Sequence, residues 1–532
     1  MTALAAALPP TARPRHVVVV GHGMVGSRFV DEIIALDPAG RLRLTVLGAE
    51  PYGPYNRVLL SEVVAGRADV AALTLAAAPA SEAIQVRTGV AAIAVDRRAR
   101  TITTDDGNSV RYDLLVLATG ARPWVPTLAG IGDQRAVAGV RTFRTIDDCR
   151  EIVAASANAR AAVVLGGGVL GVEAARGLAA RGLDVTLVHA GGHPLDRQLD
   201  EGAGFVLAQA LRALGVRLCL GAEAFGVEVE DEHCRALLLA DGQRLPADLI
   251  VLACGVRPEA RLVHDLTGAT GGVVVDDRMH ATGDPSVAAI GDCAEHRGIA
   301  AGLIAPGWAQ ARVLAELVTS TNPLARFQAA RPVLRLKAAG LDVAAVGDPG
   351  DLAAQPWTCA DGTEVVQLAD PSRGTYVKVV LRDDRVVAAT VVGAPRTASE
   401  LLLLVERGTP APLGRANLLL PHERGAAAVG AVDDPTRIPD RATICRCNGV
   451  TKGAIVSAFG EGARNIPTLA ARTRATTGCG GCTDVCAGLL SWLADSDAPP
   501  DTAPPRVAAA ASASEQQSDG TQLRAAPTGG AR

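Results

Sequence analysis

Short apolar runs that end in glycine-rich turns recur along the first part of the chain. Residues 16–20 form one such run, and Gly21 opens the turn that follows it. Apolar positions at helical spacing come next, and residues 42–47 form a second run. This order predicts a strand, a tight turn, a helix and a parallel strand, which together begin a dinucleotide-binding unit.

The same order returns about 145 residues further along the chain. Residues 161–165 form the run, Gly166 opens the turn, residues 172–180 have helical spacing and residues 185–189 form the next strand. A repeat of the whole pattern argues against a glycine-rich turn in some unrelated fold. It predicts an α/β protein with two Rossmann-like units.

The pattern changes after residue 325. Alternating apolar positions at 376–381 and 386–392 predict strands, and residues 398–407 predict a helix, so we expect an α+β domain there. A polar linker at 426–440 precedes a compact cysteine-rich segment. The chain beyond Asp497 is rich in Ala, Pro, Ser and Gly, which predicts a disordered tail.

Composition removes several classes of protein. The 532 residues carry 52 basic and 56 acidic side chains, and this balance predicts no nucleic-acid partner. No run reaches the roughly 20 apolar residues that cross a membrane, so we expect no membrane segment. Residues 1–10 are apolar without a basic start, which predicts a short disordered leader and not a signal peptide. The eleven cysteines, an odd number, therefore predict free thiols and a metal site in a cytoplasmic protein.

The first glycine turn has residues suited to a pyrophosphate. We expect Gly21 to allow the tight turn, Gly23 to let the backbone approach the phosphates and Gly26 to let helix and strand pack closely. Met24 lies in the same turn, at the start of the helix whose N-terminus faces the phosphates. Glu50 follows the second strand, where a carboxylate accepts hydrogen bonds from ribose hydroxyls.

Residues at two other strand ends indicate which nucleotide the first unit binds. Asp292 follows a buried run, where its carboxylate is placed to hold the ribitol of a flavin. Thr119 and Gly120 follow another apolar run. Together these motifs resemble the two-dinucleotide-domain flavoprotein reductases of the glutathione-reductase type, over about residues 16–325.

That resemblance implies two cofactor sites. In this family the first glycine turn and the Gly-Asp motif bind FAD, and the second turn binds the nicotinamide nucleotide. The expected FAD-binding residues are Gly21, Gly23, Met24, Gly26, Glu50, Arg57, Thr119, Gly120 and Asp292. The expected NAD(P)H-binding residues are Gly166, Gly168, Gly171, Glu173, His189 and Gly255.

Two of these positions bear on the nicotinamide nucleotide. Glu173 matches a family position near the nicotinamide, although a glutamate at a helix N-terminus also has an ordinary role beside the helix dipole. His189 stands where NADH enzymes often carry an acid, and no arginine follows it as in an NADPH enzyme. The choice between NADH and NADPH stays open. We expect no catalytic acid or base, because the hydride passes to FAD.

The flavin half lacks a CxxC pair. Its cysteines are single and scattered, so we expect small core residues and not a dithiol relay. They are Cys149, Cys219, Cys234, Cys254 and Cys293.

The cysteine-rich segment contains four thiols in two close pairs. Cys445 and Cys447 are separated by one residue, and Cys479 and Cys482 by two. Such thiolates ligate a [2Fe–2S] cluster or Zn²⁺, but zinc pairs usually have two to four intervening residues. The spacing resembles the bacterioferritin-associated-ferredoxin-like [2Fe–2S] module. Cys486 shares a helical stripe with three leucines, so we expect it to pack in the core.

Longer motifs resemble a narrower family. Residues 54–61, 197–200 and 291–298 look like the N-terminal half of assimilatory NAD(P)H nitrite reductase large subunits, and equally like the electron-transfer subunit of assimilatory nitrate reductases. Residues 336–342 fit the third domain of that family. Asn56 replaces an aspartate common in the first motif, which predicts altered flavin contacts.

The resemblance implies an electron-delivery protein. No cysteine follows Cys486, so the sequence has no sirohaem and [4Fe–4S] ligand set, and it has no molybdenum-cofactor domain. The expected partner is a molybdenum-dependent nitrate reductase or a sirohaem nitrite reductase catalytic chain, and a homodimer is left open. A ferredoxin- or rubredoxin-type reductase is the alternative enzyme. A redox or iron–sulfur sensor is the alternative outside catalysis.

The expected architecture has two Rossmann-like domains, an α+β third domain and a small helical domain. The domains are an FAD-binding domain at 14–145 and 256–325, an NAD(P)H-binding domain at 146–255, an α+β C-terminal reductase domain at 328–425, a [2Fe–2S] domain at 441–495 and a disordered tail at 496–532.

Overall fold

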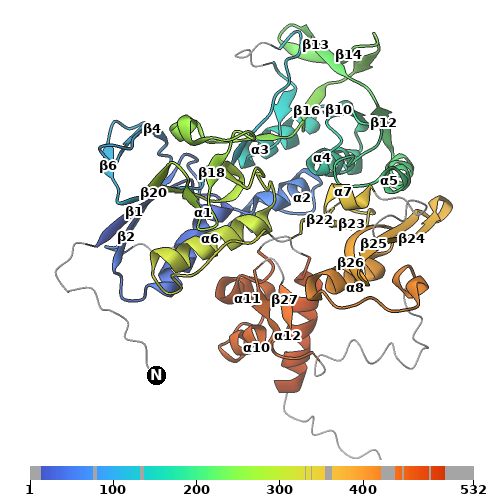
Figure 1. The fold of residues 1–532 in the computed structure, drawn as a ribbon. Helices are drawn as coiled ribbons and strands as arrows, with labels where there is room; N and C mark the ends of the chain where they lie inside the picture. The colour runs from blue at the N-terminus through green and yellow to red at the C-terminus, as the bar shows by residue number, and fades with distance from the viewer. Residues whose placement is uncertain are drawn as a thin grey trace, which may run out of the picture.

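The computed structural model describes most of the chain. The described residues are 14–75, 81–131, 137–329, 331–336, 338–353, 362–420, 438–445, 448–477 and 481–497. The expected leader, most of the expected linker and the tail beyond Asp497 lie outside these ranges, as do Cys447 and Cys479. Figure 1 shows two α/β lobes, a sheet lobe with helix α8 and a small helical module that lies below α6 in the view.

An eight-stranded sheet forms the centre of the first lobe. Its order is β21-β18-β19-β20-β7-β1-β2-β3, and β1 pairs in parallel with β2 and β7. β1 (Arg15–Val20) and β2 (Leu42–Gly48) match the two predicted runs, and α1 (Met24–Leu36) connects them and packs against α6 (Ile304–Val318). The other strands are β3 (Ile84–Thr88), β7 (Leu114–Leu117), β18 (Val273–Val275), β19 (His280–Ala281), β20 (Asp284–Ala289) and β21 (Ala294–His296).

A parallel five-stranded sheet forms the second lobe, in the order β12-β11-β10-β16-β9. Helix α4 (Val169–Ala180) begins at Val169 and not at residue 172 as predicted, because Gly168 is its N-cap and the end of the glycine turn is already helical. The strands are β9 (Val140–Thr142), β10 (Ala161–Leu165), β11 (Asp184–His189), β12 (Val216–Leu220) and β16 (Leu249–Leu252). Helices α3 (Ile146–Ser156) and α5 (Glu201–Ala213) belong to the same lobe.

The two sheets repeat one contact at the start of their central strands. In the first sheet the backbone N–H of His16 donates to the carboxylate of Asp113 at 2.7 Å. In the second, the N–H groups of Arg160 and Ala161 donate to Asp248 at 2.8 and 3.1 Å. These bonds hold the pKa of the Asp248 carboxyl below its usual range. The repeat in the sequence is therefore also a repeat in the structure.

Short strands link and flank the two lobes. After Gly120 and Gly255 the chain crosses between the lobes as β8 (Ala121–Pro123) and β17 (Val256–Pro258), which pair antiparallel. One small three-stranded sheet contains β4 (Ala92–Asp96), β5 (Thr101–Thr104) and β6 (Ser109–Arg111). Another contains β13 (Ala224–Glu230), β14 (His233–Leu239) and β15 (Arg244–Pro246).

The third lobe is an antiparallel sheet that packs against the long helix α8 and the short helix α7 (Pro349–Leu352), as the α+β prediction requires. Its order is β22-β23-β26-β25-β24, and α8 (Pro395–Arg407) packs on β26 and β23. The helix begins at Pro395 and not at residue 398 as predicted, since proline is well suited to the first turn of a helix. The strands are β22 (Val333–Arg335), β23 (Val343–Val346), β24 (Thr363–Asp370), β25 (Thr375–Arg382) and β26 (Arg385–Val392).

The cysteine-rich module is small and mostly helical. It contains β27 (Thr443–Cys445), β28 (Val450–Thr451), α10 (Lys452–Gly460), α11 (Ile466–Thr473) and α12 (Thr483–Asp497). Cys486, Leu489 and Leu490 are buried in one core with Cys445 and Phe459. The predicted core position of Cys486 agrees with this packing.

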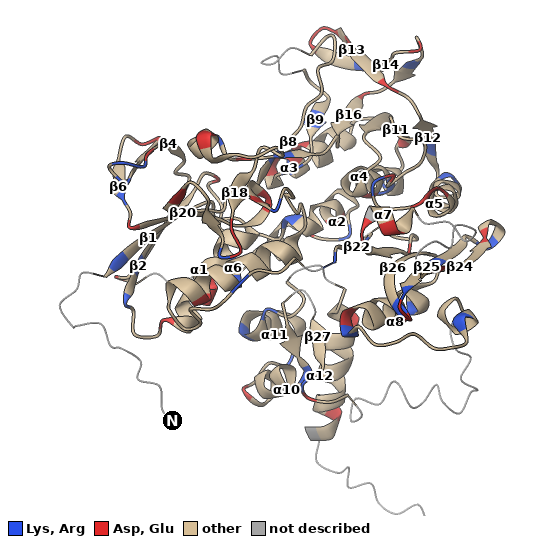
Figure 2. Ribbon diagram, in the orientation of Figure 1, with Lys and Arg blue, Asp and Glu red and all other residues tan. Residues whose placement is uncertain are grey.

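The described residues carry charges of both signs. None of the described helices is long and apolar enough to cross a bilayer. Figure 2 shows acidic and basic residues interspersed along the ribbon in the described parts of all the lobes. This mixture agrees with the balanced composition.

A buried ion pair joins the second lobe to the third. The ammonium of Lys378 on β25 lies 2.8 Å from the carboxylate of Asp200, and only 1% of the Lys378 side chain is exposed. The hydroxyl of Tyr376 donates to the same carboxylate at 2.8 Å, and Lys378 also donates to the carbonyl oxygen of Leu352. Asp200 is the N-cap of α5, so the third lobe is attached to the end of a helix in the second.

Replacing Lys378 with Met should loosen this joint. The variant leaves the carboxylate of Asp200 buried without its cation, a change that costs roughly 3–5 kcal/mol. We expect the first transition in urea-induced unfolding to move to a lower urea concentration. The control, Arg217→Met, breaks an ion pair with Asp184 whose side chains are 60% and 57% exposed, and it should cost less than about 1 kcal/mol. Equal midpoints for the two variants would contradict the role of Lys378.

Candidate functional site

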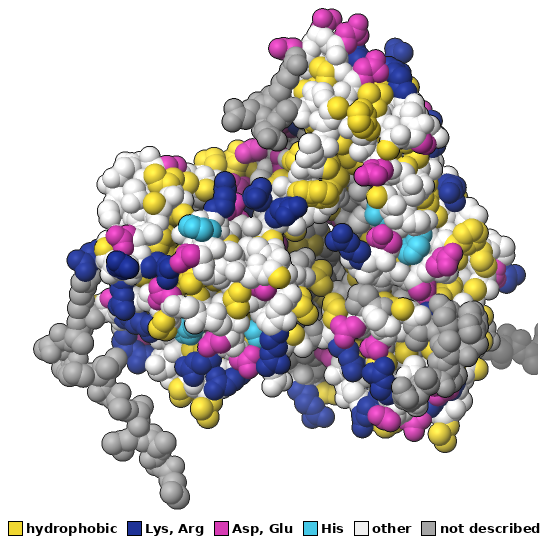
Figure 3. Space-filling model, turned by 45° about the horizontal axis from the view of Figure 1, so that its top comes forward, with side chains coloured by type: hydrophobic (Ala, Val, Ile, Leu, Met, Phe, Trp, Pro, Cys, Tyr) yellow, Lys and Arg dark blue, Asp and Glu magenta, His cyan; other side chains and the backbone are white. Residues whose placement is uncertain are grey.

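A cleft of about 840 Å³ opens at the carboxyl ends of the parallel strands of the first lobe. Every residue expected to bind FAD lines this cleft except Gly26. The lining continues to Leu303 and Ile304 at the start of α6. In the space-filling view of Figure 3, a recess lies between the lobes and is bordered by Lys and Arg side chains. A cleft of this size is large enough for a dinucleotide.

The three glycines of the first turn differ in the room around them. A Cβ on Gly21 (φ +110°) would lie 2.2 Å from the carbonyl oxygen of Ala118, and a Cβ on Gly26 would lie 2.0 Å from that of Gly21. A Cβ on Gly23 would meet nothing closer than Arg57, at 3.8 Å. The outer glycines are therefore required by the fold, whereas Gly23 leaves open space that a pyrophosphate can occupy.

The second turn repeats this arrangement. A Cβ on Gly166 (φ +115°) would lie 2.3 Å from the carbonyl oxygen of Ala253, and a Cβ on Gly171 would lie 1.8 Å from that of Gly166. No atom lies within 4 Å of a Cβ placed on Gly168. In both turns the outer glycines are tightly packed and the middle glycine has open space around it, and both turns precede a helix N-terminus.

Charged side chains in the cleft are paired with one another. Glu50 accepts a hydrogen bond from the hydroxyl of Tyr55 at 2.7 Å and forms an ion pair with Arg57. Asp292 forms an ion pair with Arg144 at 2.8 Å. Burial raises the pKa of Tyr55 far above its usual value, so the phenol stays a donor. Each carboxylate keeps further lone pairs for sugar hydroxyls, so both are suited to the adenosine ribose and the ribitol of FAD.

Sequence reasoning missed Tyr55 and Arg144. Tyr55 lies inside the motif at 54–61, which was noted for its likeness to a family and not for its hydroxyl. Arg144 belongs to no motif and is 148 residues from Asp292, the acid it holds. Only the folding of α3 against the first lobe brings the two side chains together.

The residues expected to bind NAD(P)H lie in the second lobe and at its edge. Glu173 is buried in α4 and does not line the cleft. A hydrogen bond from Arg67 to Glu62 raises the pKa of Arg67, and the negative charge of Glu173 raises it further. His189 ends β11, and its Nε2 lies 3.2 Å from the carboxylate of Asp196. Gly255 (φ +106°) begins the crossing between the lobes, with open space around it. The second glycine turn, His189 and Gly255 are thus set at the carboxyl ends of β10, β11 and β16.

The scattered cysteines behave as core residues. Cys149, Cys234 and Cys293 are buried, while Cys219 and Cys254 are partly buried against the core of the second lobe. Burial raises the pKa of the Cys149, Cys234 and Cys254 thiols to about 11. Thiols in this state are protonated at neutral pH and react slowly, which agrees with the absence of a dithiol relay.

Two of the four predicted cluster ligands can be placed. Cys445 is fully buried and Cys482 is 6% exposed. Hydrogen bonds with the thiols of Cys445 and Cys486, together with burial, raise the pKa of the Cys482 thiol well above its usual range. Among the described residues no group of three or more His, Cys, Asp or Glu is arranged to hold a metal ion, and the other two predicted ligands, Cys447 and Cys479, lie outside them. Neighbouring buried thiols are a donor set that a thiophilic iron–sulfur cluster satisfies.

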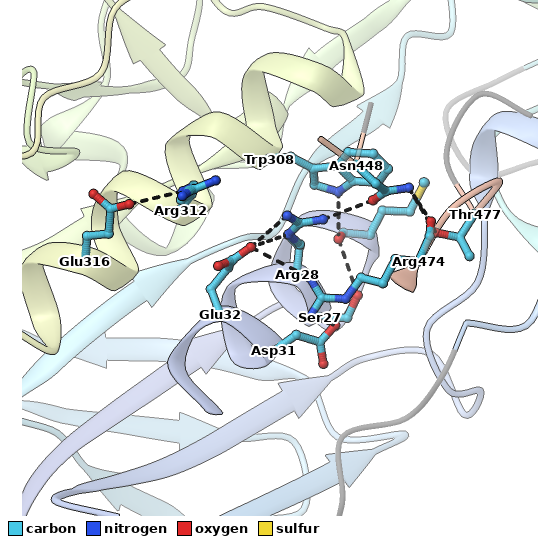
Figure 4. A network of polar contacts seen from close by, with 11 residues as sticks. Ser27, Arg28, Asp31, Glu32, Trp308, Arg312, Glu316, Asn448, Arg474 and Thr477 are labelled. Carbon is cyan, nitrogen blue, oxygen red and sulfur yellow. Dashed lines mark hydrogen bonds and ion pairs between the residues drawn. The ribbon is translucent and has the colours of Figure 1, made fainter. Parts of the chain in front are cut away.

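The cysteine-rich module is bound to the first lobe through polar contacts (Figure 4). Arg474 pairs with Asp31 at 3.3 Å and with Glu32 at 3.7 Å, both on α1. The amide of Asn56 donates to the carbonyl oxygen of Thr477 at 2.7 Å. Asn56 does not line the cleft, whereas its neighbours Tyr55 and Arg57 do, and its effect on flavin contacts stays a prediction. Its amide N–H serves the module, a contact that an ionised aspartate could not make.

Comparison with known proteins places the chain in a family. Residues 15–313 match the model of the pyridine nucleotide-disulphide oxidoreductases, which covers more than half of the chain. The chain belongs to this family. Residues 332–409 match the C-terminal domain of rubredoxin NAD⁺ reductase, and residues 443–492 match the BFD-like [2Fe–2S] binding domain. The predicted fold class is confirmed.

Relatives over most of the chain are reductases. The chain is 34% identical to nitrite reductase [NAD(P)H] of Bacillus subtilis over 492 residues, which are 91% of this chain and 58% of that protein. It is 31% identical to the assimilatory nitrate reductase electron transfer subunit of the same bacterium, over 91% of this chain and 60% of that protein. The chain therefore spans less than two thirds of the length of these relatives. The structure of a covalent putidaredoxin reductase–putidaredoxin complex superposes with a TM-score of 0.67 and 25% identity, over 79% of this chain and 99% of that chain.

These matches agree with the cofactors predicted from the motifs. The oxidoreductase family uses FAD and NAD(P)H, and the BFD-like module carries a [2Fe–2S] cluster. The chain is thus an FAD-dependent NAD(P)H oxidoreductase that has its own cluster module.

Alanine at the two middle glycines should separate the two nucleotide sites. Both positions have room for a methyl group in the protein but not beside a closely bound pyrophosphate. We expect Gly23→Ala to lower the FAD content of the purified protein. We expect Gly168→Ala to keep FAD but raise the KM for the nicotinamide nucleotide. Loss of FAD from Gly168→Ala with normal FAD in Gly23→Ala would mean that the sites are assigned the wrong way round.

Proposed function

We propose that the chain takes hydride from NAD(P)H onto FAD and passes single electrons through its [2Fe–2S] cluster to a nitrate or nitrite reductase catalytic chain. The observation that supports this order most is the contact between the cysteine-rich module and the wall of the FAD cleft. Asn56 lies between Tyr55 and Arg57, which both line the cleft, and its side chain binds Thr477. Thr477 is two positions before Cys479, a proposed cluster ligand.

The side chains of the cleft have positioning roles in this proposal. Gly23 and the N-terminus of α1 bind the pyrophosphate, Glu50 accepts ribose hydroxyls, and Arg144 orients Asp292 toward the ribitol. FAD supplies the conversion of a two-electron hydride into single electrons when it is bound. The assigned site residues are those expected from the sequence, with Cys445, Cys447, Cys479 and Cys482 as cluster ligands.

The proposed partner rests on the relatives. One relative is named as the electron transfer subunit of assimilatory nitrate reductase and another as nitrite reductase. We propose a molybdenum-dependent nitrate reductase as the first acceptor to test and a sirohaem nitrite reductase as the second. A cytoplasmic location fits the free buried thiols. The domain boundaries given by the sequence are proposed with one change. The first segment of the FAD-binding domain ends before Val140, because β9 pairs with β16 of the second lobe.

Removing one ligand should separate hydride transfer from electron delivery. In Cys482→Ser the cluster should be lost, while anaerobic stopped-flow should still show reduction of FAD by NADH or NADPH, because that step needs only the first two lobes. Reduction of an added nitrate reductase catalytic chain should fall to background. The control is Cys486→Ala. Cys486 lies on α12, four positions after Cys482, and its replacement should keep the cluster. If folded, FAD-loaded Cys482→Ser no longer accepts hydride, the proposed order of electron transfer is wrong.

A rubredoxin-type reductase is the second candidate. The match of residues 332–409 to the rubredoxin NAD⁺ reductase C-terminal domain supports it, whereas a cluster module on the same chain argues against it. The same assay separates the two functions. Rubredoxin reduction that survives in Cys482→Ser would favour direct transfer from the flavin to an external carrier.

We further propose that the enzyme prefers NADH. Asp196 places a carboxylate beside His189, at the strand end where a ribose 2′-hydroxyl binds in such units. A carboxylate accepts a hydrogen bond from that hydroxyl but repels the 2′-phosphate of NADPH. Asp196→Asn should therefore raise kcat/KM for NADPH relative to NADH by about tenfold, equal to about 1.4 kcal/mol. Asp184→Asn, at the exposed start of the same strand, is the control, and equal ratios in the two variants would refute the role of Asp196.

A further inference from the structure

The side-chain amide of Asn448 connects the first lobe with a proposed cluster ligand. Its oxygen accepts a hydrogen bond from Arg28 Nη1 at 3.0 Å. Its nitrogen lies 3.7 Å from the sulfur of Cys445, within hydrogen-bonding range for sulfur. The same nitrogen donates to the carbonyl oxygen of Arg474 at 2.6 Å and lies 3.2 Å from Thr477 Oγ1. Asn448 thus receives a hydrogen bond from one lobe and donates in the module that holds the cluster (Figure 4).

Arg28 is fixed in place by its own neighbours. It lies on α1, one helical turn or about 6 Å beyond Met24, which lines the FAD cleft. Its guanidinium pairs with Glu32 at 2.7 Å and lies 5.7 Å from the centre of the Trp308 ring. Only 13% of its side chain is exposed. A cation held this firmly cannot swing away to solvent without breaking these contacts.

A hydrogen bond from Arg28 changes what the amide of Asn448 can do. A cation at the amide oxygen polarises the group and strengthens the N–H as a donor, because hydrogen bonds in a chain reinforce one another. A donor to a ligating sulfur stabilises the additional negative charge of a reduced cluster and raises its reduction potential. The charge of Arg28 is thereby transmitted to Cys445 only while the module contacts the first lobe.

We propose that Asn448 is a positioning residue that transmits the charge of Arg28 to Cys445, so that contact with the flavin lobe raises the reduction potential of the cluster. This proposal rests on the proposed function, because Cys445 must be a ligand. In the step concerned, one electron passes from reduced FAD to the oxidised cluster. Asn448 makes and breaks no covalent bond and transfers no proton. The contact that brings the cluster to the cleft would then also favour its reduction.

The test is a redox titration of the cluster in the full-length protein, loaded with FAD and iron–sulfur and followed by EPR. Arg28→Ala and Asn448→Ala should each lower the midpoint potential of the cluster. A tenfold loss of electron affinity corresponds to about 59 mV for one electron. In the double variant the effect of Arg28→Ala should vanish, because its charge acts through Asn448. Arg28→Lys should restore part of the potential.

The control is Arg472→Ala, which removes a cation of the same module whose partner is Glu461, also within the module. The cluster in Arg472→Ala should have the same midpoint potential as the cluster in the unchanged protein. If Asn448→Ala does not retain the cluster, the midpoint potential of Arg28→Ala is the test of the proposal, because Arg28 lies in the other lobe. Unchanged potentials in Arg28→Ala, or an equal shift in the Asn448→Ala background, would overturn the proposal.

The result is distinct from a failure of the proposed function. If the cluster is absent, or stays oxidised when NAD(P)H reduces FAD in the unchanged protein, the proposed function fails. If the cluster is present and NAD(P)H reduces it, but its potential does not respond to Arg28, only the present inference fails.

Discussion

The close approach of a glycine turn to the neighbouring strand governs the geometry of both dinucleotide-binding lobes. At Gly21 the chain runs so near to the carbonyl of Ala118 that a side chain has no room, and Gly26 is pressed against Gly21 in the same way. This packing brings the N-terminus of α1 to the carboxyl ends of the strands. The cleft, the direction of the helix dipole and the positions of Glu50 and Asp292 all follow from it. Its repetition at Gly166 and Gly171 makes a second site from the same design.

Polar joints connect the lobes of the protein. The second and third lobes meet through the buried pair of Lys378 and Asp200, while the first lobe and the cysteine-rich module meet through arginines that are only partly exposed. Such joints are specific in geometry, since a buried charge without its partner is costly. An apolar joint would hold the lobes together with less control over their orientation. For electron transfer the orientation matters, because the cluster must lie close to the flavin.

Placing the cluster module on the same chain as the flavin also affects the rate of the first electron transfer. A tethered module is present at a high effective concentration beside the cleft, so the first electron transfer needs no encounter between molecules. In the proposed function, the module then has only to present its cluster to a second protein. The polar contact between Arg474 and α1 fixes the face of the module that meets the first lobe, which is the face that accepts the electron in the proposed function.

The sequence by itself determined the local elements and the chemistry of the ligands. Strands, glycine turns, the Gly-Asp motif and the paired cysteines are short-range patterns, and residues a few positions apart carry all their information. What depended on distant residues was decided only by the tertiary structure. Arg144 meets Asp292, Asn56 binds Thr477 of the cysteine-rich module, and Arg28 meets Asn448. The partners in these three contacts are 148, 421 and 420 residues apart in the sequence. Such pairings leave no periodic trace in a single sequence, because each partner obeys the pattern of its own element and the two meet only when the lobes pack.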